Sequence, residues 1–194
     1  MSTKVLKVLI CIAGLLPAGA LVAGAFTDNL GANPIELITH ETGTSALTFL
    51  VVTLSVTPIR RLTGWHEVIR VRRMLGLFAF FYACLHFLIW FVFDHTLNPR
   101  GMVDDVMKRP YITVGMAGLL MMIPLALTST AAMIRRLGRR WRMLHRLTYG
   151  AAVAGVVHFW WLVKADLTEP QRWAAALTVL FGLRAWWMLR RRYG

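Results

Sequence analysis

Long apolar stretches separated by short polar segments dominate this chain of 194 residues. A helix needs about 20 apolar residues to cross the roughly 30 Å hydrocarbon core of a membrane. Six segments reach or approach this length, at residues 5–26, 34–58, 74–93, 111–129, 147–163 and 173–189, and no internal repeat stands out. The pattern predicts an all-α membrane protein in which residues 1–194 form one domain with six transmembrane helices.

The first apolar segment fits either a retained helix or a cleaved signal peptide. Lys4 and Lys7 precede its apolar run, and small residues follow at 23–25, as at a signal-peptide cleavage site. The run is about 19 residues long, whereas the apolar region of a signal peptide has about 7–15 residues. We therefore expect a retained transmembrane helix.

The charge distribution predicts an orientation. The chain is 57% apolar and 16% charged, with a formal net charge of +13. With six spans, 17 of the 22 Lys and Arg residues fall on the side of the two termini, and Glu67 is the only acidic residue there. The positive-inside rule then makes both termini cytoplasmic. The basic runs adjoin membrane helices, which favours contact with anionic lipid and gives little support to a nucleic-acid partner.

Two of the six histidines lie in the middle of apolar segments. His86 lies 13 residues beyond Arg73, and His158 lies 13 residues beyond His145. At 1.5 Å per residue, both lie about 20 Å from the cytoplasmic edge and share one level toward the outer leaflet. Ionisable groups at membrane depth are costly and are functional by default. Two imidazoles at one level of a helix bundle predict bis-histidine ligation of a haem iron.

His145 lies at the inner edge of the fifth segment and is the candidate ligand of a second haem. Thirteen residues turn a straight helix by about 220°, so His145 and His158 do not share a face of one helix. The third segment carries Arg72 and Arg73 at the inner level, and His66 in the preceding basic loop could reach over. The second axial ligand of an inner haem therefore stays open.

The other candidate residues favour structural roles. His40 and His95 lie at the outer boundary, where interfacial histidines are common. Cys11 and Cys84 lack the spacing of a zinc site or a redox pair and are poor disulfide candidates. Zinc is also disfavoured at the level of the two buried histidines, because no carboxylate or thiolate cluster accompanies them. No residue is predicted to be catalytic.

The polar segments offer only weak signals for partners. No dinucleotide-binding fingerprint follows a strand, so electrons would enter from one separate partner and leave to another. The basic inner loops could hold a flavin phosphate. Asp104 and Asp105 in an outer loop could steer a docking partner.

Several short motifs occur together in one order and spacing. They are GLLP at 14–17, TP at 57–58, RRMLGL at 72–77, RPYITVG at 109–115, LTST at 127–130, LGRRW at 137–141 and LH at 144–145, with His86 and His158 between and after them. With these motifs the chain resembles the MsrQ (formerly YedZ) family over nearly its whole length.

This resemblance implies a ferric-reductase-like transmembrane domain, a six-helix haem b bundle in the bacterial inner membrane. One or two haems would be held by His86, His145 and His158. Electrons would come from the quinone pool, or from a cytoplasmic flavin reductase through bound FMN. They would pass to MsrP, a periplasmic molybdopterin enzyme that reduces methionine sulfoxide in oxidised proteins. The chain would be the electron-transfer subunit of this oxidoreductase, and substrate reduction would occur on the partner.

Three other functions are weighed against this one. A metal reductase of the same fold would deliver electrons to ferric or cupric ions. A cytochrome b subunit of a respiratory complex would also bind haem. A small transporter or membrane scaffold would bind none, and its buried histidines would carry protons.

Overall fold

The computed structural model describes residues 2–193, and side chains are described for residues 2–190. These residues form helices and no strand. The elements are α1 (Thr3–Phe26), α2 (Pro34–Thr63), η1 (His66–Arg70), α3 (Arg72–Ile89), η2 (Trp90–Asp94), α4 (Pro99–Lys108), α5 (Pro110–Leu127), α6 (Ala131–Leu137), α7 (Arg139–Leu144), α8 (Leu147–Leu162) and α9 (Thr168–Tyr193).

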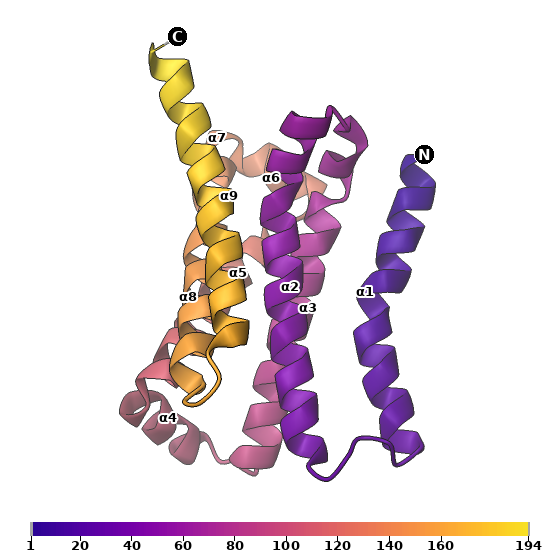
Figure 1. Cartoon of the computed structure of the whole chain (residues 1–194), viewed down its shortest axis with the longest axis vertical. Helices are drawn as coiled ribbons and strands as arrows, with labels where there is room; N and C mark the ends of the chain where they lie inside the picture. The colour runs from indigo at the N-terminus through magenta and orange to yellow at the C-terminus, as the bar shows by residue number, and fades with distance from the viewer. Residues whose placement is uncertain (1, 194) are drawn as a thin grey trace.

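The long helices run side by side along one axis, as Figure 1 shows for α1, α2, α3, α5, α8 and α9. Helix α4 lies across one end of this bundle, and α6 and α7 lie toward the other end. Helix α1 begins and α9 ends at the end away from α4. All-helical architecture is therefore confirmed, and the described part of the chain begins and ends on the same side of the bundle.

Four helical segments are long and apolar enough to cross a membrane: α1, α2, α5, and α3 together with η2. The fifth and sixth predicted spans are also helices, but α8 has only 16 residues and the apolar stretch of α9 contains Arg184. Two segments between the predicted spans contain further helices. Helix α4 occupies the segment after η2, and α6 and α7 occupy much of the segment between α5 and α8.

Helix α2 extends past the predicted end at residue 58. The helix begins at Pro34 behind the Asn33 cap and ends at Thr63, and its C-cap Gly64 has a φ of 70°, which suits a glycine. Pro58 lies inside this helix and has no N–H, so the carbonyl of Leu54 lacks its helical donor. The guanidinium of Arg184 in α9 donates to that carbonyl. A half-buried cation therefore replaces the missing hydrogen bond, and the helix continues to Thr63.

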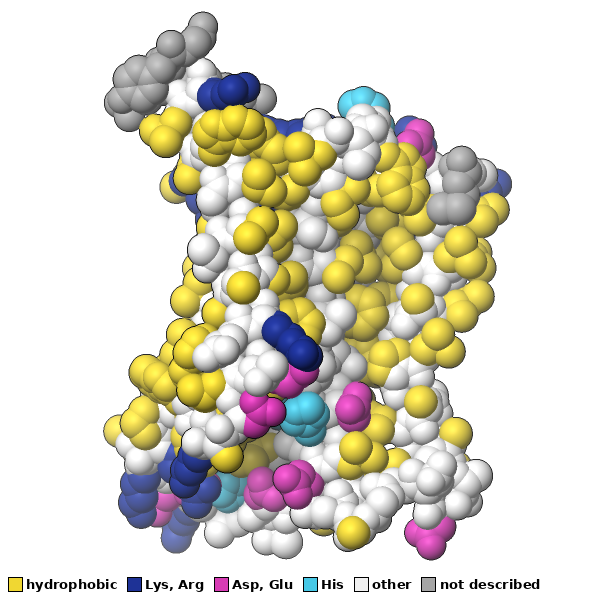
Figure 2. Space-filling model, in the orientation of Figure 1, with side chains coloured by type: hydrophobic (Ala, Val, Ile, Leu, Met, Phe, Trp, Pro, Cys, Tyr) yellow, Lys and Arg dark blue, Asp and Glu magenta, His cyan; other side chains and the backbone are white. Residues whose placement is uncertain are grey.

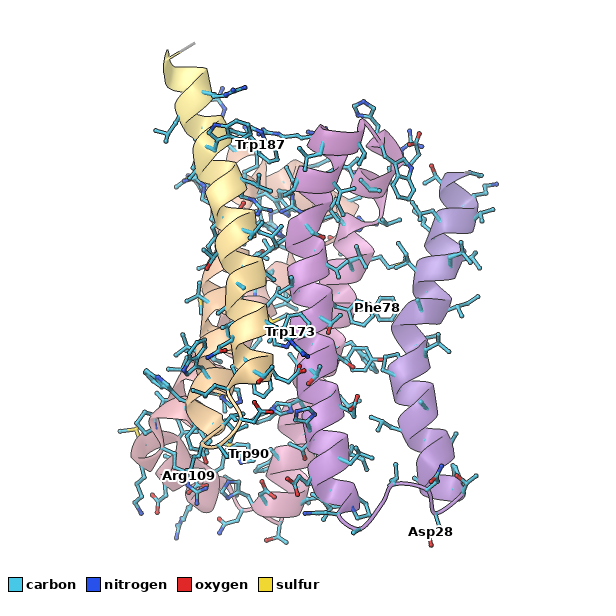
Figure 3. The ribbon with its side chains drawn as sticks, in the orientation of Figure 1. Asp28, Phe78, Trp90, Arg109, Trp173 and Trp187 are labelled. Atoms are coloured by element: carbon cyan, nitrogen blue, oxygen red, sulfur yellow. The ribbon has the colours of Figure 1, made fainter. Side chains whose placement is uncertain are left out.

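Helix α1 joins the bundle through α3. The Tyr82 hydroxyl, which is buried, donates to the Gly14 carbonyl at 2.7 Å and accepts from the Ala18 N–H at 3.1 Å. It inserts into the helical hydrogen bonding of α1 next to Pro17. Phe78 points from α3 toward α1 (Figure 3) and fills the space that a side chain at Gly14 would need.

The centre of the bundle consists of two helix pairs. Helix α2 packs most extensively on α3, and α5 packs most extensively on α8. Leu54, Ala79 and Ala152 are completely buried among these helices. On the face seen in Figure 2, apolar side chains cover much of the surface, and most acidic side chains gather toward the end that carries α4. The two pairs therefore form the core in which the buried histidines lie.

Candidate functional site

A cavity of about 290 Å³ lies between α2, α3, α5 and α8, near the end of the bundle that carries α4. Its walls are mainly apolar and include Leu50, Phe87 and Phe159. His86 from α3 and His158 from α8 meet in it, with ring centroids 6.1 Å apart and ring planes at 81°. The structure thus brings together the two histidines whose equal depth predicted one level.

Backbone carbonyls fix the orientation of both imidazoles. His86 Nδ1 lies 2.9 Å from the Thr39 carbonyl, and His158 Nδ1 lies 2.7 Å from the Tyr111 carbonyl. A carbonyl oxygen only accepts, so each Nδ1 carries the proton and donates. Each neutral ring then keeps its lone pair on Nε2. Histidines that bind metals commonly donate their other ring nitrogen in this way.

Two glycines let the neighbouring helices approach the imidazoles. A Cβ atom at Gly43 would lie 3.1 Å from the His86 ring. A Cβ atom at Gly115 would lie only 2.6 Å from His158 Nδ1, a distance that real Cβ atoms essentially never show. Position 115 must therefore be a glycine for the His158 ring to lie where it does. At position 43, a glycine leaves space for the His86 ring.

The same arrangement of a carbonyl, a glycine and a histidine, here called a histidine clamp, occurs twice along the chain. In each helix pair, the accepting carbonyl lies 47 residues before its histidine, with the glycine four residues after that carbonyl. The corresponding residues are Thr39, Gly43 and His86 in α2 and α3, and Tyr111, Gly115 and His158 in α5 and α8. The two pairs are thus offset by 72 residues and present their histidines to one shared cavity.

The paired imidazoles are suited to hold one metal ion between them. With metal–nitrogen bonds of about 2.0 Å, two rings on opposite sides of an ion have centroids about 6 Å apart. The observed separation of 6.1 Å agrees with this geometry. Among the described residues, no group of three or more His, Cys, Asp or Glu side chains is placed to hold a metal. A metal bound here would therefore need further ligands besides these side chains.

His145 lies apart from this cavity, in the turn between α7 and α8. The prediction that it continues the helix of His158 is wrong, because α8 begins only at Leu147. Its ring stacks on Trp141, with centroids 3.8 Å apart, and its Nε2 lies 3.1 Å from Thr128 Oγ1. The inner histidine is therefore held by an indole and a hydroxyl.

The hydrogen bonds of the Thr128 hydroxyl show which ring nitrogen of His145 carries the proton. This hydroxyl donates to the Pro124 carbonyl at 2.6 Å, so it accepts from His145 Nε2–H and leaves the lone pair on Nδ1. Burial lowers the pKa of His145, and the nearby Arg72 guanidinium lowers it further. The imidazole is therefore neutral at pH 7, with Nδ1 as its only free ligand atom.

The remaining predicted residues lie in three different surroundings. His40 lines the mouth of the cavity, whereas His66 is exposed at the start of η1. His95 Nε2 lies 3.5 Å from Asp105 Oδ2. Asp104, the other acidic residue expected to face a partner, pairs with Lys108 on α4. Asp105 is therefore engaged within the chain, and Asp104 remains at the surface.

Comparison with known proteins places this architecture in a family. A family model described as the ferric reductase like transmembrane component matches residues 42–156. The protein-methionine-sulfoxide reductase heme-binding subunit MsrQ of Ralstonia nicotianae is 52% identical over 192 residues, which cover 97% of this chain and 88% of that protein. The protein of the same name from Herminiimonas arsenicoxydans is 50% identical over 190 residues, covering 96% and 87%. The chain belongs to the MsrQ family.

The region matched by the ferric-reductase-like family model contains most of the residues that line the cavity. It runs from the middle of α2 into α8, contains His86 and His145, and ends two residues before His158. It also includes Gly43 and Gly115. The matched region therefore covers most of the two helix pairs that build the site, although Thr39 and His158 lie outside it.

Several parts of the site had no signal in the sequence. The carbonyls of Thr39 and Tyr111 belong to the backbone, which every residue has, so their role appears only in the folded chain. Gly43 and Gly115 could have been found from the 72-residue offset that they share with the histidines. Thr128 and Trp141, which hold His145, lie in quoted motifs but show no pattern that links them to it.

Proposed function

We propose that this chain is the haem-binding electron-transfer subunit of a protein-methionine-sulfoxide reductase system. Family membership and the names of its relatives support this proposal. Electrons would pass through b-type haem to the periplasmic molybdopterin enzyme MsrP, which reduces methionine sulfoxide in oxidised proteins. The donor would be the quinone pool or a cytoplasmic flavin reductase. The chain would carry electrons, and the partner would carry out the reduction of the substrate.

The observation that carries the proposal is the matched pair of histidines in one apolar cavity. Their rings lie 6.1 Å apart, and both Nδ1 atoms are used by carbonyls, so both Nε2 atoms are available to one iron. The glycines beside the rings leave room for the imidazoles, and the walls are mainly apolar. These residues fit a haem, since a porphyrin supplies the four ligands that the chain lacks.

Each part of the cavity would have its own task once haem is bound. The haem supplies one-electron chemistry at its iron. His86 and His158 would hold the haem iron, and the Thr39 and Tyr111 carbonyls keep both rings in the tautomer that leaves Nε2 free. The apolar walls exclude water and thereby help to set the reduction potential.

We propose six transmembrane helices in the bacterial inner membrane, with both termini cytoplasmic. Helix α1 begins and α9 ends at one end of the bundle, and the segments at that end carry most of the basic residues. In this orientation α4 and the cavity mouth lie on the periplasmic side. The histidine pair would then lie close to a periplasmic acceptor.

A second haem at the inner end is a separate proposal that rests on His145. The Nε2 atom of His145 bonds to Thr128 here, so an inner haem would use Nδ1 or would require the ring to leave that hydroxyl. The basic residues of this end would also be where a flavin phosphate of FMN binds.

The experiment that tests this function joins the chain to MsrP. The purified protein in nanodiscs is reduced, and its haem spectrum is followed after addition of MsrP and methionine sulfoxide. Reoxidation that requires both additions is expected. Reoxidation by ferric or cupric chelates but not by MsrP would instead support a metal reductase. A folded, haem-free protein would leave the transporter or scaffold as the better account.

A further inference from the structure

Arg109 is the only lysine or arginine among the described residues that line the histidine cavity. It lies between α4 and α5, at the end of the bundle where Figure 3 labels it together with Trp90. Asp94 and His40 line the same mouth. The cavity therefore combines apolar walls with a single permanent cation at its opening.

Two neighbours hold the Arg109 guanidinium in place. Its Nε lies 3.2 Å from Asp105 Oδ1, and its Nη1 donates to the Tyr111 hydroxyl at 3.3 Å. The hydrogen bond to Tyr111 and the charges of Asp105 and Asp94 raise the pKa of Arg109. A guanidinium has five N–H donors, and these two contacts leave most of them free. The cation is thus oriented while it keeps donors for a ligand.

Tyr111 connects this cation to the histidine site. Its hydroxyl binds Arg109, its backbone carbonyl accepts from His158 Nδ1, and its ring centroid lies 6.1 Å from the His158 ring. The start of α5 therefore fixes the positions of the guanidinium and of one proposed iron ligand together. Tyr111 thus contacts both the guanidinium and the His158 ring.

We propose that Arg109 binds a propionate carboxylate of the haem held between His86 and His158. The inference rests on the proposed function, because it presupposes that haem occupies the cavity. Haem b is an apolar ring with two carboxylates on one edge, and a guanidinium at the polar mouth of an apolar cavity matches that shape. Asp94 at the same mouth would repel a carboxylate, so an attractive cation is needed to offset it.

Asp105 is a positioning residue in this arrangement. It accepts from Arg109 through Oδ1, and its Oδ2 faces His95 Nε2, whose side chain is only 10% exposed. The carboxylate thereby ties α4 to the end of η2 and fixes one side of the guanidinium.

The test compares iron protoporphyrin IX with its dimethyl ester, in which both propionates are blocked. Haem-depleted protein is titrated with each compound, and binding is followed by the Soret absorbance. The preference is the ratio of the two dissociation constants. In Arg109→Gln we expect this preference to fall about tenfold, toward the lower end for a charge-assisted hydrogen bond. The Arg109 side chain is 53% exposed, and solvent weakens the contact.

Matched variants separate a propionate contact from a structural role. If Arg109 only held the fold, its loss would weaken binding of both compounds equally and leave the preference unchanged, and that result would overturn the inference. Lys108→Gln removes a neighbouring exposed cation that does not line the cavity, and its preference should equal that of the wild type. If Arg109→Gln does not fold, Arg109→Met, which also removes the charge, is compared instead, and the same fall or constancy of the preference decides.

A different result of this experiment would refute the proposed function itself. If the wild-type protein is folded but binds neither compound, haem binding itself fails and the proposed function falls with it. If the wild type binds haem and the preference of Arg109→Gln equals that of the wild type, only the role of Arg109 is wrong.

Discussion

The histidines at the two ends of the bundle differ in their hydrogen-bond partners and in which ring nitrogen is free. Near α4, His86 and His158 donate through Nδ1 to backbone carbonyls and share one cavity. At the opposite end, His145 donates through Nε2 to Thr128, and Trp141 stacks on its ring. The first arrangement leaves two Nε2 atoms for one ion, whereas the second leaves a single Nδ1 atom.

The repeated clamp explains why the two ends differ. Positions 86 and 158 are equivalent under the 72-residue offset, and both are histidine. His145 lies in the turn before α8, and the residue 72 positions earlier is Arg73 inside α3. The two helix pairs therefore supply matched histidines at one end only. This comparison teaches that a buried histidine needs a matching partner and a fixed tautomer before it forms a bis-histidine site.

Removal of either clamp histidine should have the largest effect. His86→Ala and His158→Ala should each abolish the haem of the outer cavity, because each substitution deletes one axial ligand. His145→Ala should leave that haem in place. The measurement is the pyridine haemochrome content per folded chain. Normal haem content in His86→Ala or His158→Ala would contradict the pairing.

A side chain at Gly115 should weaken the clamp without removing a ligand. The new Cβ would lie 2.6 Å from His158 Nδ1, so the imidazole must shift. Overpacking of this kind costs about 1–3 kcal/mol, which corresponds to roughly 5- to 150-fold weaker haem binding. Gly43→Ala should have a smaller effect, since its Cβ would lie 3.1 Å from the His86 ring.

The control for this series is Gly182→Ala in α9, where an added Cβ meets nothing within 4 Å. Haem titration of the three glycine variants gives the comparison. If Gly115→Ala binds haem as tightly as Gly182→Ala does, the position of His158 is not confined by α5.

Thr128→Val should affect the inner end alone. The substitution removes the acceptor of His145 Nε2–H and should destabilise the fold by about 1–3 kcal/mol. The outer haem should keep its spectrum and its affinity. Thermal unfolding in detergent and a Soret titration measure the two effects. Loss of the outer haem in this variant would mean that the two ends are not independent.

The helices and the proximity of His86 to His158 could be predicted from the sequence, because both depend on the regular geometry of single helices. Apolar length sets each span, and equal rise per residue sets equal depth. The turn before α8 and the short helix α4 escaped prediction, since short polar segments have no clear periodicity. The continuation of α2 past Pro58 depends on Arg184, which is 126 residues away in sequence. The carbonyl partners of the histidines are likewise products of tertiary contact.

The most direct test of the central claim is the reduced-minus-oxidised absorbance spectrum of the detergent-purified protein, together with its haem count. A low-spin b-type spectrum with at least one haem per chain is predicted. A second haem would give His145 a ligand role as well. A folded protein that takes up no haem when haem is abundant would contradict the account, because the two free Nε2 atoms would then have no ion to hold.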